Sequence, residues 1–189
     1  MESIRSFLAL ELGKFFKEDI SRIIETLRTD KAKVKWVNPD SAHMTLHFFG
    51  QLSLDEIESL YAPLSRLASE YKSLELGLDT VGVFPSIKRP RIIWIGLRGD
   101  IDFLQSLKTK LNYILKKHGF SPEEKKFIPH LTIGRVKDFK HDYEFSDRLR
   151  SVTYSSEGTA KVSEMIFFKS KLTPSGPQYT VLKTFLFEK

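Results

Sequence analysis

Two histidines of this chain stand in the same short setting, and their residue types could support acid-base chemistry. The first is His43 in "SAHMTLHFFG", residues 41–50, and the second is His130 in "IPHLTIGRV", residues 128–136. In each motif the histidine is followed by any residue, a threonine and an aliphatic residue. The chain has five histidines, so a repeated setting is a stronger signal than a single short motif, which often matches by accident.

Both motifs have the apolar alternation of a half-buried strand, in which every second side chain points to the same face. The positions that this alternation turns toward the core are Met44, Leu46, Phe48, Leu131 and Ile133. The positions that it turns outward are His43, Thr45, His47, His130 and Thr132. Each strand is therefore expected to present an imidazole and a hydroxyl side by side, and the plainer alternative is a pair of solvent-facing polar strands.

An imidazole has a pKa of about 6.5, so one histidine can act as a base and another as an acid at neutral pH. Threonine hydroxyls beside them can donate to phosphate oxygens, and this set suits in-line attack on a phosphodiester without a metal. A metal site is disfavoured because His43 and His47 would lie roughly 13 Å apart on a strand. Neither motif has an acidic residue at a ligand position, and the absence of cysteine excludes disulfides, thiolate nucleophiles and Cys-based zinc sites.

A cation is also needed for the developing charge, and Arg135 follows the second motif. Strict alternation would put Arg135 on the core face, opposite His130. Gly134 could accommodate a bulge that turns the side chain round, so we assign Arg135 to the site on that condition. The competing interpretation is a salt-bridged arginine at the end of a strand.

Strand-like and helix-like segments are interleaved around the motifs without βαβ regularity. Helical patterns cover residues 17–30, 53–71 and 101–120, where Ser53 and Glu56 have capping-box spacing and Pro63 should kink or divide its helix. Strand-like runs cover residues 4–12, 34–50, 74–84, 91–97, 160–170 and 178–187. The order of a helix followed by a histidine strand occurs once in each half, which predicts an α+β fold of two related lobes with antiparallel sheets.

The composition is that of a folded chain of 189 residues, with 41% hydrophobic residues and a net charge of +6. This basic balance favours a polyanionic partner without identifying one. The N-terminal apolar run is short and is interrupted by Arg5, so it predicts neither a signal peptide nor a membrane span. We expect a cytoplasmic protein without a membrane partner. No Pro/Gly/Ser-rich linker divides the chain, which predicts one bilobal domain over residues 1–189.

The sequence resembles the two-histidine (2H) phosphoesterases, specifically the RNA 2′,3′-cyclic phosphodiesterases, also called 2′-5′ RNA ligases. The resemblance covers nearly the whole chain: "IRSFLALEL", "VKWVNPDSAHMTLHFFG", "RPRIIWIGL", "FIPHLTIGRV" and "FFKSKLTPSGPQYTVLKTFLF" are similar to the family's strands and motifs. It implies a bilobal fold with pseudo-two-fold symmetry, in which two antiparallel sheets flank a basic central cleft and helices lie outside.

The resemblance also implies roles for the residues that match. His43 would be the general acid for the leaving O3′, and His130 would be the base that activates water. Thr45, Thr132 and Arg135 would hold the phosphate. The implied activity is hydrolysis of RNA 2′,3′-cyclic phosphate ends to 2′-phosphomonoesters without metal or cofactor, with the reverse 2′-5′ ligation needing no ATP. The implied partner is RNA bearing such an end or a 2′-5′ linkage, bound by a monomer.

Two other functions remain open: a non-catalytic module that binds RNA ends, and a phosphodiesterase acting on a small cyclic nucleotide. His47 stands where the family often has lysine, so it either contacts RNA or is merely exposed. His118 and His141 are expected on the surface. Four aromatic side chains could stack on a base, although core packing is the more common role. They are Phe49, Phe84, Trp94 and Tyr179.

Overall fold

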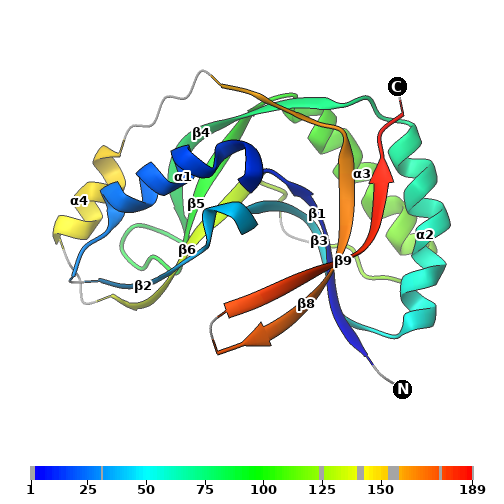
Figure 1. The fold of residues 1–189 in the computed structure, drawn as a ribbon, viewed down its shortest axis with the longest axis horizontal. Coiled ribbons are helices and arrows are strands. Elements are labelled where there is room, and N and C mark those ends of the chain that lie inside the picture. Colours follow the sequence, from blue (N-terminus) through cyan, green and yellow to red (C-terminus); the bar gives the residue numbers. More distant parts are fainter. Residues whose placement is uncertain are drawn as a thin grey trace.

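The chain folds into two antiparallel β-sheets with helices on their outer sides (Figure 1). The computed structural model describes residues 3–30, 32–123, 126–139, 143–152, 158–174 and 176–188. The four-stranded sheet has the order β3-β1-β8-β9 and the five-stranded sheet the order β2-β6-β5-β4-β7. The strands of the first sheet are β1 Ile4–Glu11, β3 His43–Leu52, β8 Glu164–Thr173 and β9 Gly176–Leu186. Those of the second are β2 Ala32–Trp36, β4 Leu74–Phe84, β5 Ile92–Gly99, β6 His130–Phe139 and β7 Ala160–Val162.

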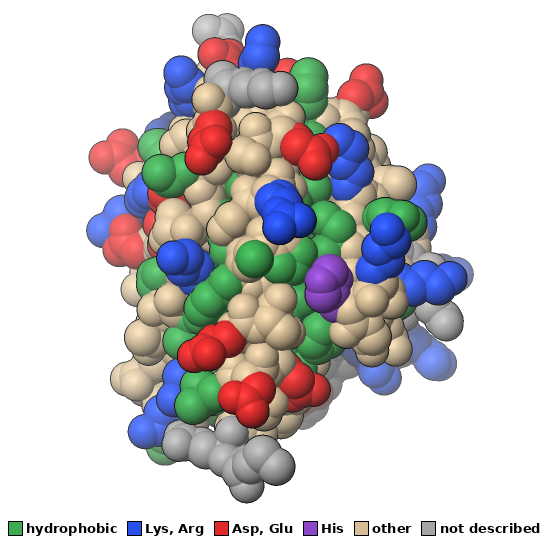
Figure 2. All heavy atoms as spheres, turned by 90° about the vertical axis from the view of Figure 1, so that its right-hand side faces the viewer, with side chains coloured by type: hydrophobic (Ala, Val, Ile, Leu, Met, Phe, Trp, Pro, Cys, Tyr) green, Lys and Arg blue, Asp and Glu red, His purple; other side chains and the backbone are tan. Residues whose placement is uncertain are grey.

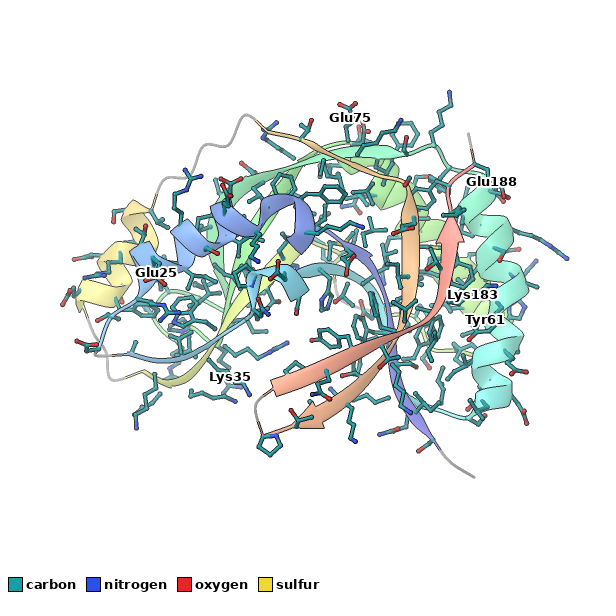
Figure 3. All side chains as sticks on the ribbon, in the orientation of Figure 1. Glu25, Lys35, Tyr61, Glu75, Lys183 and Glu188 are labelled. Carbon is teal, nitrogen blue, oxygen red and sulfur yellow. The ribbon has the colours of Figure 1, made fainter. Side chains whose placement is uncertain are left out.

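The helices pack on the outer sides of the sheets (Figure 1). They are α1 Gly13–Leu27, α2 Leu54–Ser69, α3 Ile101–Lys117, α4 Tyr143–Ser151 and the short 3₁₀ helix η1 Pro39–Ser41. Helix α2 covers the four-stranded sheet, where the Tyr61 ring lies 6.3 Å from that of Phe167 and beneath the ammonium of Lys183 (Figure 3). Charged side chains of both signs alternate over the side of the molecule that carries α2 (Figure 2).

The two faces of the four-stranded sheet are both apolar, but they belong to different clusters. One buried cluster runs through the whole fold and includes Leu8 and Leu10. Their neighbours Phe7 and Ala9 point to the opposite face of β1, because side chains alternate along a strand. There they form a small second cluster with Ile166 and Phe168, against which Tyr179 packs. We call the face that carries this second cluster the inner face.

The α+β class and the two antiparallel sheets are as the sequence predicts, and several local details differ. Helix α2 runs continuously through Pro63, so the predicted division is wrong. The capping box does form, with Ser53 N–H donating to Glu56 Oε2 at 2.7 Å. Strand β3 continues past Gly50, whose φ of 76° is in the left-handed region, to Leu52. Helix α4 was not predicted. Within the described residues, no helix combines the length and apolarity needed to cross a membrane.

Candidate active site

The two histidine motifs lie on strands of different sheets that come together in the fold. His43 is the first residue of β3 in the four-stranded sheet, and His130 is the first residue of β6 in the five-stranded sheet. The backbones of β3 and β6 approach each other, so these strands form a seam between the sheets. The two histidines therefore occupy equivalent positions, one on each side of the seam.

His43 is fixed by one hydrogen bond and by aromatic contacts on the inner face. Its Nδ1 lies 2.9 Å from the carbonyl oxygen of Ser41. Its ring stacks on Phe7 with centroids 4.8 Å apart and meets the edge of Tyr179 at 5.1 Å. The first imidazole thus packs against the small second cluster.

His130 is held in the same manner in the other sheet. Its Nδ1 lies 2.6 Å from the carbonyl oxygen of Ile128, again the residue two positions earlier. The Phe84 ring meets it edge-on at 5.2 Å, and Trp94 lies 6.0 Å away. Phe84 and Trp94 stack on each other at 5.0 Å. A side chain at Gly82 would collide with the Trp94 indole, so the glycine leaves room for this platform.

These hydrogen bonds determine which ring nitrogen of each histidine can react. A backbone carbonyl can only accept, so Nδ1 of His43 and of His130 must carry the proton and donate it. Nε2 is then the nitrogen available to a substrate in both rings. In the neutral form Nε2 is a base, and in the protonated form it is an acid. The local structure therefore suits proton transfer at two matched nitrogens.

The protonation of His43 depends on its surroundings in both sheets. Burial lowers the pKa of His43 most, and the hydrogen bond to Ser41 acts against it. The charge of Arg135 lowers the pKa further, while that of Glu11 raises it. Arg135 belongs to β6, so the first imidazole is influenced by a charge from the other sheet. Arg135 also acts on Tyr179, whose pKa burial raises.

A β-bulge explains why Arg135 is turned out of the core. Along β6, Thr132 pairs with Trp94 and Gly134 pairs with Ile93, so Ile133 is the extra residue. The extra residue reverses the alternation that follows it, and both Ile133 and Gly134 are buried while Arg135 is exposed. The sequence pointed to a bulge at Gly134, and the structure has it one residue earlier.

The first motif also contains a β-bulge, and this bulge makes two of the predictions from the sequence wrong. Thr45 pairs with Ala9 and His47 pairs with Leu8, so Leu46 is the extra residue. After it the faces exchange: His47 is only 4% exposed, whereas Phe48 is 42% exposed. The predictions of an outward His47 and a core-facing Phe48 are therefore both wrong, because strict alternation cannot anticipate a bulge.

His47 is a buried, neutral histidine packed against aromatic side chains. Its ring lies 4.6 Å from Phe49, which in turn stacks on Phe167 at 4.9 Å. Burial lowers the pKa of His47 to about 4, and the nearby charge of Lys108 contributes in the same direction. Nδ1 of His47 has no hydrogen-bond partner among the described residues. It is thus part of the core behind the first motif.

Lys108 is a residue near the site that the motifs did not reveal. It lies on α3, is 3% exposed, and donates a 2.6 Å hydrogen bond from Nζ to the carbonyl oxygen of Leu46, the bulge residue. Nζ also pairs with Glu123 Oε2 at 3.2 Å and lies over the Phe127 ring. One ammonium thus connects the bulge of the first motif with the segment that leads into the second. Burial lowers the pKa of Lys108, and Glu123 opposes this.

The two motif threonines and the other two histidines complete the set of residues that the sequence singled out. The hydroxyl-bearing Thr45 is exposed and Thr132 is half-buried; within the described residues neither has a side-chain hydrogen bond. His118 is exposed, as expected, and its Nδ1 donates to Ile114. His141 lies outside the described residues.

A basic region extends from Arg135 along the five-stranded sheet. Lys35 pairs directly with Arg135 on the neighbouring strand, so both side chains lie on one face. Lys35 projects toward the β8–β9 hairpin, and its Nζ would lie 3.8 Å from a Cβ at Gly176 (Figure 3). Lys35 also borders a cavity of about 730 Å³ beside β2, whose lining includes neither motif histidine. Among the described residues, no three His, Asp or Glu side chains gather as metal ligands.

Comparison with known proteins gives one consistent result. The family model "LigT like Phosphoesterase" matches residues 12–94 and again residues 97–179, one match for each half. An RNA 2′,3′-cyclic phosphodiesterase of Methanothermobacter thermautotrophicus is 32% identical over 182 residues, covering 96% of this chain and 98% of that protein. A protein of the same name from Thermotoga maritima is 33% identical over 185 residues, covering 98% and 96%.

Solved structures agree in fold. The crystal structure of E. coli LigT complexed with 3′-AMP matches with a TM-score of 0.75 and 25% identity over 100% of both chains. A Thermus thermophilus protein matches with a TM-score of 0.73 and 23% identity over 98% of both, which supports the fold alone. With the family model covering most of the sequence in two copies, the chain belongs to the LigT-like phosphoesterase family of enzymes.

Proposed function

We propose that this protein hydrolyses the 2′,3′-cyclic phosphate at the end of RNA to a 2′-phosphomonoester, by acid-base catalysis with two histidines. The names of the relatives supply the substrate class. The observation that carries the mechanism is the matched pair of Nδ1 hydrogen bonds to the carbonyls of Ser41 and Ile128. These bonds leave one reactive Nε2 on each side of the seam.

In the reaction, His130 acts as the base and His43 as the acid. Nε2 of His130 takes a proton from water, whose oxygen attacks the phosphorus in line with the bond to O3′. That bond breaks, and Nε2 of protonated His43 donates its proton to the departing O3′. The product has a 3′-hydroxyl and a 2′-phosphate. The family resemblance assigns acid and base, since the two local structures are nearly symmetric.

Three further side chains stabilise the phosphate in this account. The hydroxyls of Thr45 and Thr132 donate to the non-bridging oxygens, one from each sheet. Arg135 supplies positive charge where negative charge develops in the transition state. Bound substrate also helps to protonate His43, because its negative charge offsets the effect of Arg135 on that imidazole.

The proposed reaction should need no metal ion, and the same site should also be able to join RNA ends. The acid, base and cation all come from side chains, so turnover should persist in excess EDTA. A 2′,3′-cyclic phosphate is strained and already carries the free energy needed to form a new ester. The same site can therefore join such an end to the hydroxyl of a second RNA, which attacks phosphorus in place of water while the bond to O3′ breaks, giving a 2′-5′ linkage without ATP.

The test is incubation with a short RNA ending in a 2′,3′-cyclic phosphate in excess EDTA, followed by identification of the product ends. Opening to the 2′-phosphate that is lost in His43→Ala and in His130→Ala supports the proposal. His118→Ala is the matched control, because this exposed histidine lies outside the site. Formation of a 3′-phosphate, or full activity in either motif variant, would contradict it.

Two other functions make different predictions in the same assay. A non-catalytic RNA-end-binding module would bind the RNA without turnover, and His130→Ala would weaken binding rather than abolish a reaction. An enzyme for small cyclic nucleotides would open a nucleoside 2′,3′-cyclic phosphate as well as it opens RNA. We also propose a single domain over residues 1–189, which the one continuous core through both halves supports, and a monomer, which follows from the family resemblance.

A further inference from the structure

We propose that Arg5 and Phe48 form a subsite for the nucleotide that precedes the cyclic phosphate end, Phe48 stacking on its base and Arg5 binding its phosphate. The subsite would make the enzyme prefer an RNA strand over a nucleoside 2′,3′-cyclic phosphate. This inference rests on the proposed function, because it takes the terminal phosphate to lie between the two histidines.

Phe48 occupies the place in the first half that Arg135 occupies in the second. Each is the third residue after the motif threonine, and each follows a bulge that turns it out of the core. Phe48 pairs with Phe7 on β1, so it lies on the inner face, which also carries the small second cluster that packs against His43. With 42% of its surface exposed, this ring offers an apolar face beside the site.

Arg5 supplies the cation that the first motif itself lacks. It lies two residues before Phe7 on β1, on the same face, and its guanidinium carbon is 4.7 Å from the centre of the Phe48 ring. No acidic side chain pairs with Arg5 among the described residues. The charge of Arg5, like that of Arg135, is felt at Tyr179, which touches His43. Arg5 and Arg135 thus both act electrostatically on an aromatic side chain that contacts the first imidazole.

The direction of the RNA follows from the chemistry of the end. A 2′,3′-cyclic phosphate is at the 3′ terminus, so every other phosphate lies on its 5′ side. Because O3′ must leave toward His43, the terminal ribose lies on the side of the four-stranded sheet. The next phosphate then lies over the inner face of that sheet, which also carries Arg5. Stacking on an aromatic ring together with an arginine is a common way to bind single-stranded RNA.

The experiment compares adenosine 2′,3′-cyclic phosphate with the dinucleotide ApA carrying the same cyclic end. We expect Arg5→Gln and Phe48→Leu each to lower the ratio of kcat/KM for the dinucleotide to kcat/KM for the mononucleotide by roughly tenfold. Arg66→Gln is the matched control: it removes one exposed charge on α2, which covers the opposite face, and should keep the wild-type ratio. Turnover of the mononucleotide serves as the internal measure of folding.

A binding measurement separates this inference from the proposed reaction. A labelled trinucleotide ending in a 2′-phosphate should bind with a salt dependence whose log–log slope is smaller by about 0.7 in Arg5→Gln, the value for one phosphate contact in a single strand. Phe48→Leu should weaken binding without changing the slope. An unchanged slope in Arg5→Gln, or an equal loss on both substrates, would overturn the subsite. Wild-type binding with the expected slope but no turnover would overturn only the reaction.

Discussion

Lys108 on α3 donates a 2.6 Å hydrogen bond to the carbonyl oxygen of Leu46, the extra residue of the bulge that follows Thr45. This contact links the two halves of the family match, because Lys108 belongs to the second and Leu46 to the first. Through Glu123 the same ammonium is tied to the segment before His130. We therefore expect Lys108 to act as a positioning residue for the first motif.

We predict that Lys108→Cys lowers kcat about 100-fold with a smaller effect on KM, because a displacement near 1 Å in a site has that cost. The chain has no other cysteine, so the variant can be alkylated in denaturant with 2-bromoethylamine and refolded. The thiolate displaces bromide, and the product restores an ammonium at the length of lysine. Recovery of kcat after this treatment, but not after iodoacetamide, is the expected result.

Lys110 provides a matched control for the Lys108 prediction. Lys110 is on the same helix but is exposed and paired with Glu70, so Lys110→Cys should keep its activity through both treatments. If the aminoethylated Lys108→Cys protein refolds to the wild-type melting temperature and stays inactive, the positioning role is wrong.

His47 should make the protein less stable in acid. The pKa of this buried histidine is about 4 in the fold against 6.5 when unperturbed. Between these values the unfolded chain binds the extra proton, so the contribution is fully present above about pH 6.5 and is lost as pH falls toward 4. The difference of about 2.5 pH units corresponds to about 3.5 kcal/mol at roughly 1.4 kcal/mol per pH unit.

Urea unfolding at pH 7 and pH 4.5 measures this effect. His47→Leu, which also removes a buried nitrogen without a partner, should lose less stability on acidification than the wild-type protein. His118→Asn, at an exposed position, should behave as wild type. An identical loss in His47→Leu and wild type would show that His47 does not titrate in this range.

Arg135→Gln should change both the rate and the titration of His43. Loss of the cation should lower kcat on a nucleoside 2′,3′-cyclic phosphate by about 100-fold or more. Burial would still depress the pKa of His43, but without Arg135 that pKa should rise. The measurement is an NMR titration of the imidazole Cε1–H signals, with the neighbouring exposed cation removed in Lys137→Gln as control. An unchanged or lower pKa in Arg135→Gln would contradict the geometry.

The sequence predicted the fold and both motif strands because their apolar periodicity is regular up to each threonine. It failed just after Thr45, where alternation placed His47 outside and Phe48 inside. A bulge depends on pairing with a neighbouring strand, and nothing in the local pattern marks Leu46 as the extra residue. At the second motif, Gly134 did suggest an irregularity. The sequence therefore predicted that Arg135 is exposed if a bulge forms there.

The sequence also contains a weaker indication that Lys108 is important. It falls among Leu104, Leu107 and Leu111 on the buried stripe of α3, and a charged residue inside such a stripe needs a partner. The partner is a backbone carbonyl 62 residues away in the chain, which no local pattern can identify. Arg5 and Phe48 were likewise invisible as a pair, because only the pairing of β1 with β3 brings them together.

The division of acid and base roles between His43 and His130 can be tested with a cyclic substrate that has sulfur in place of O3′. A thiolate leaves without needing a proton, so we predict that His43→Ala regains near-wild-type turnover on this substrate while His130→Ala stays inactive. If His130→Ala is the variant that recovers, the roles are reversed. If neither variant recovers, or both do, the division of labour between the two histidines is contradicted.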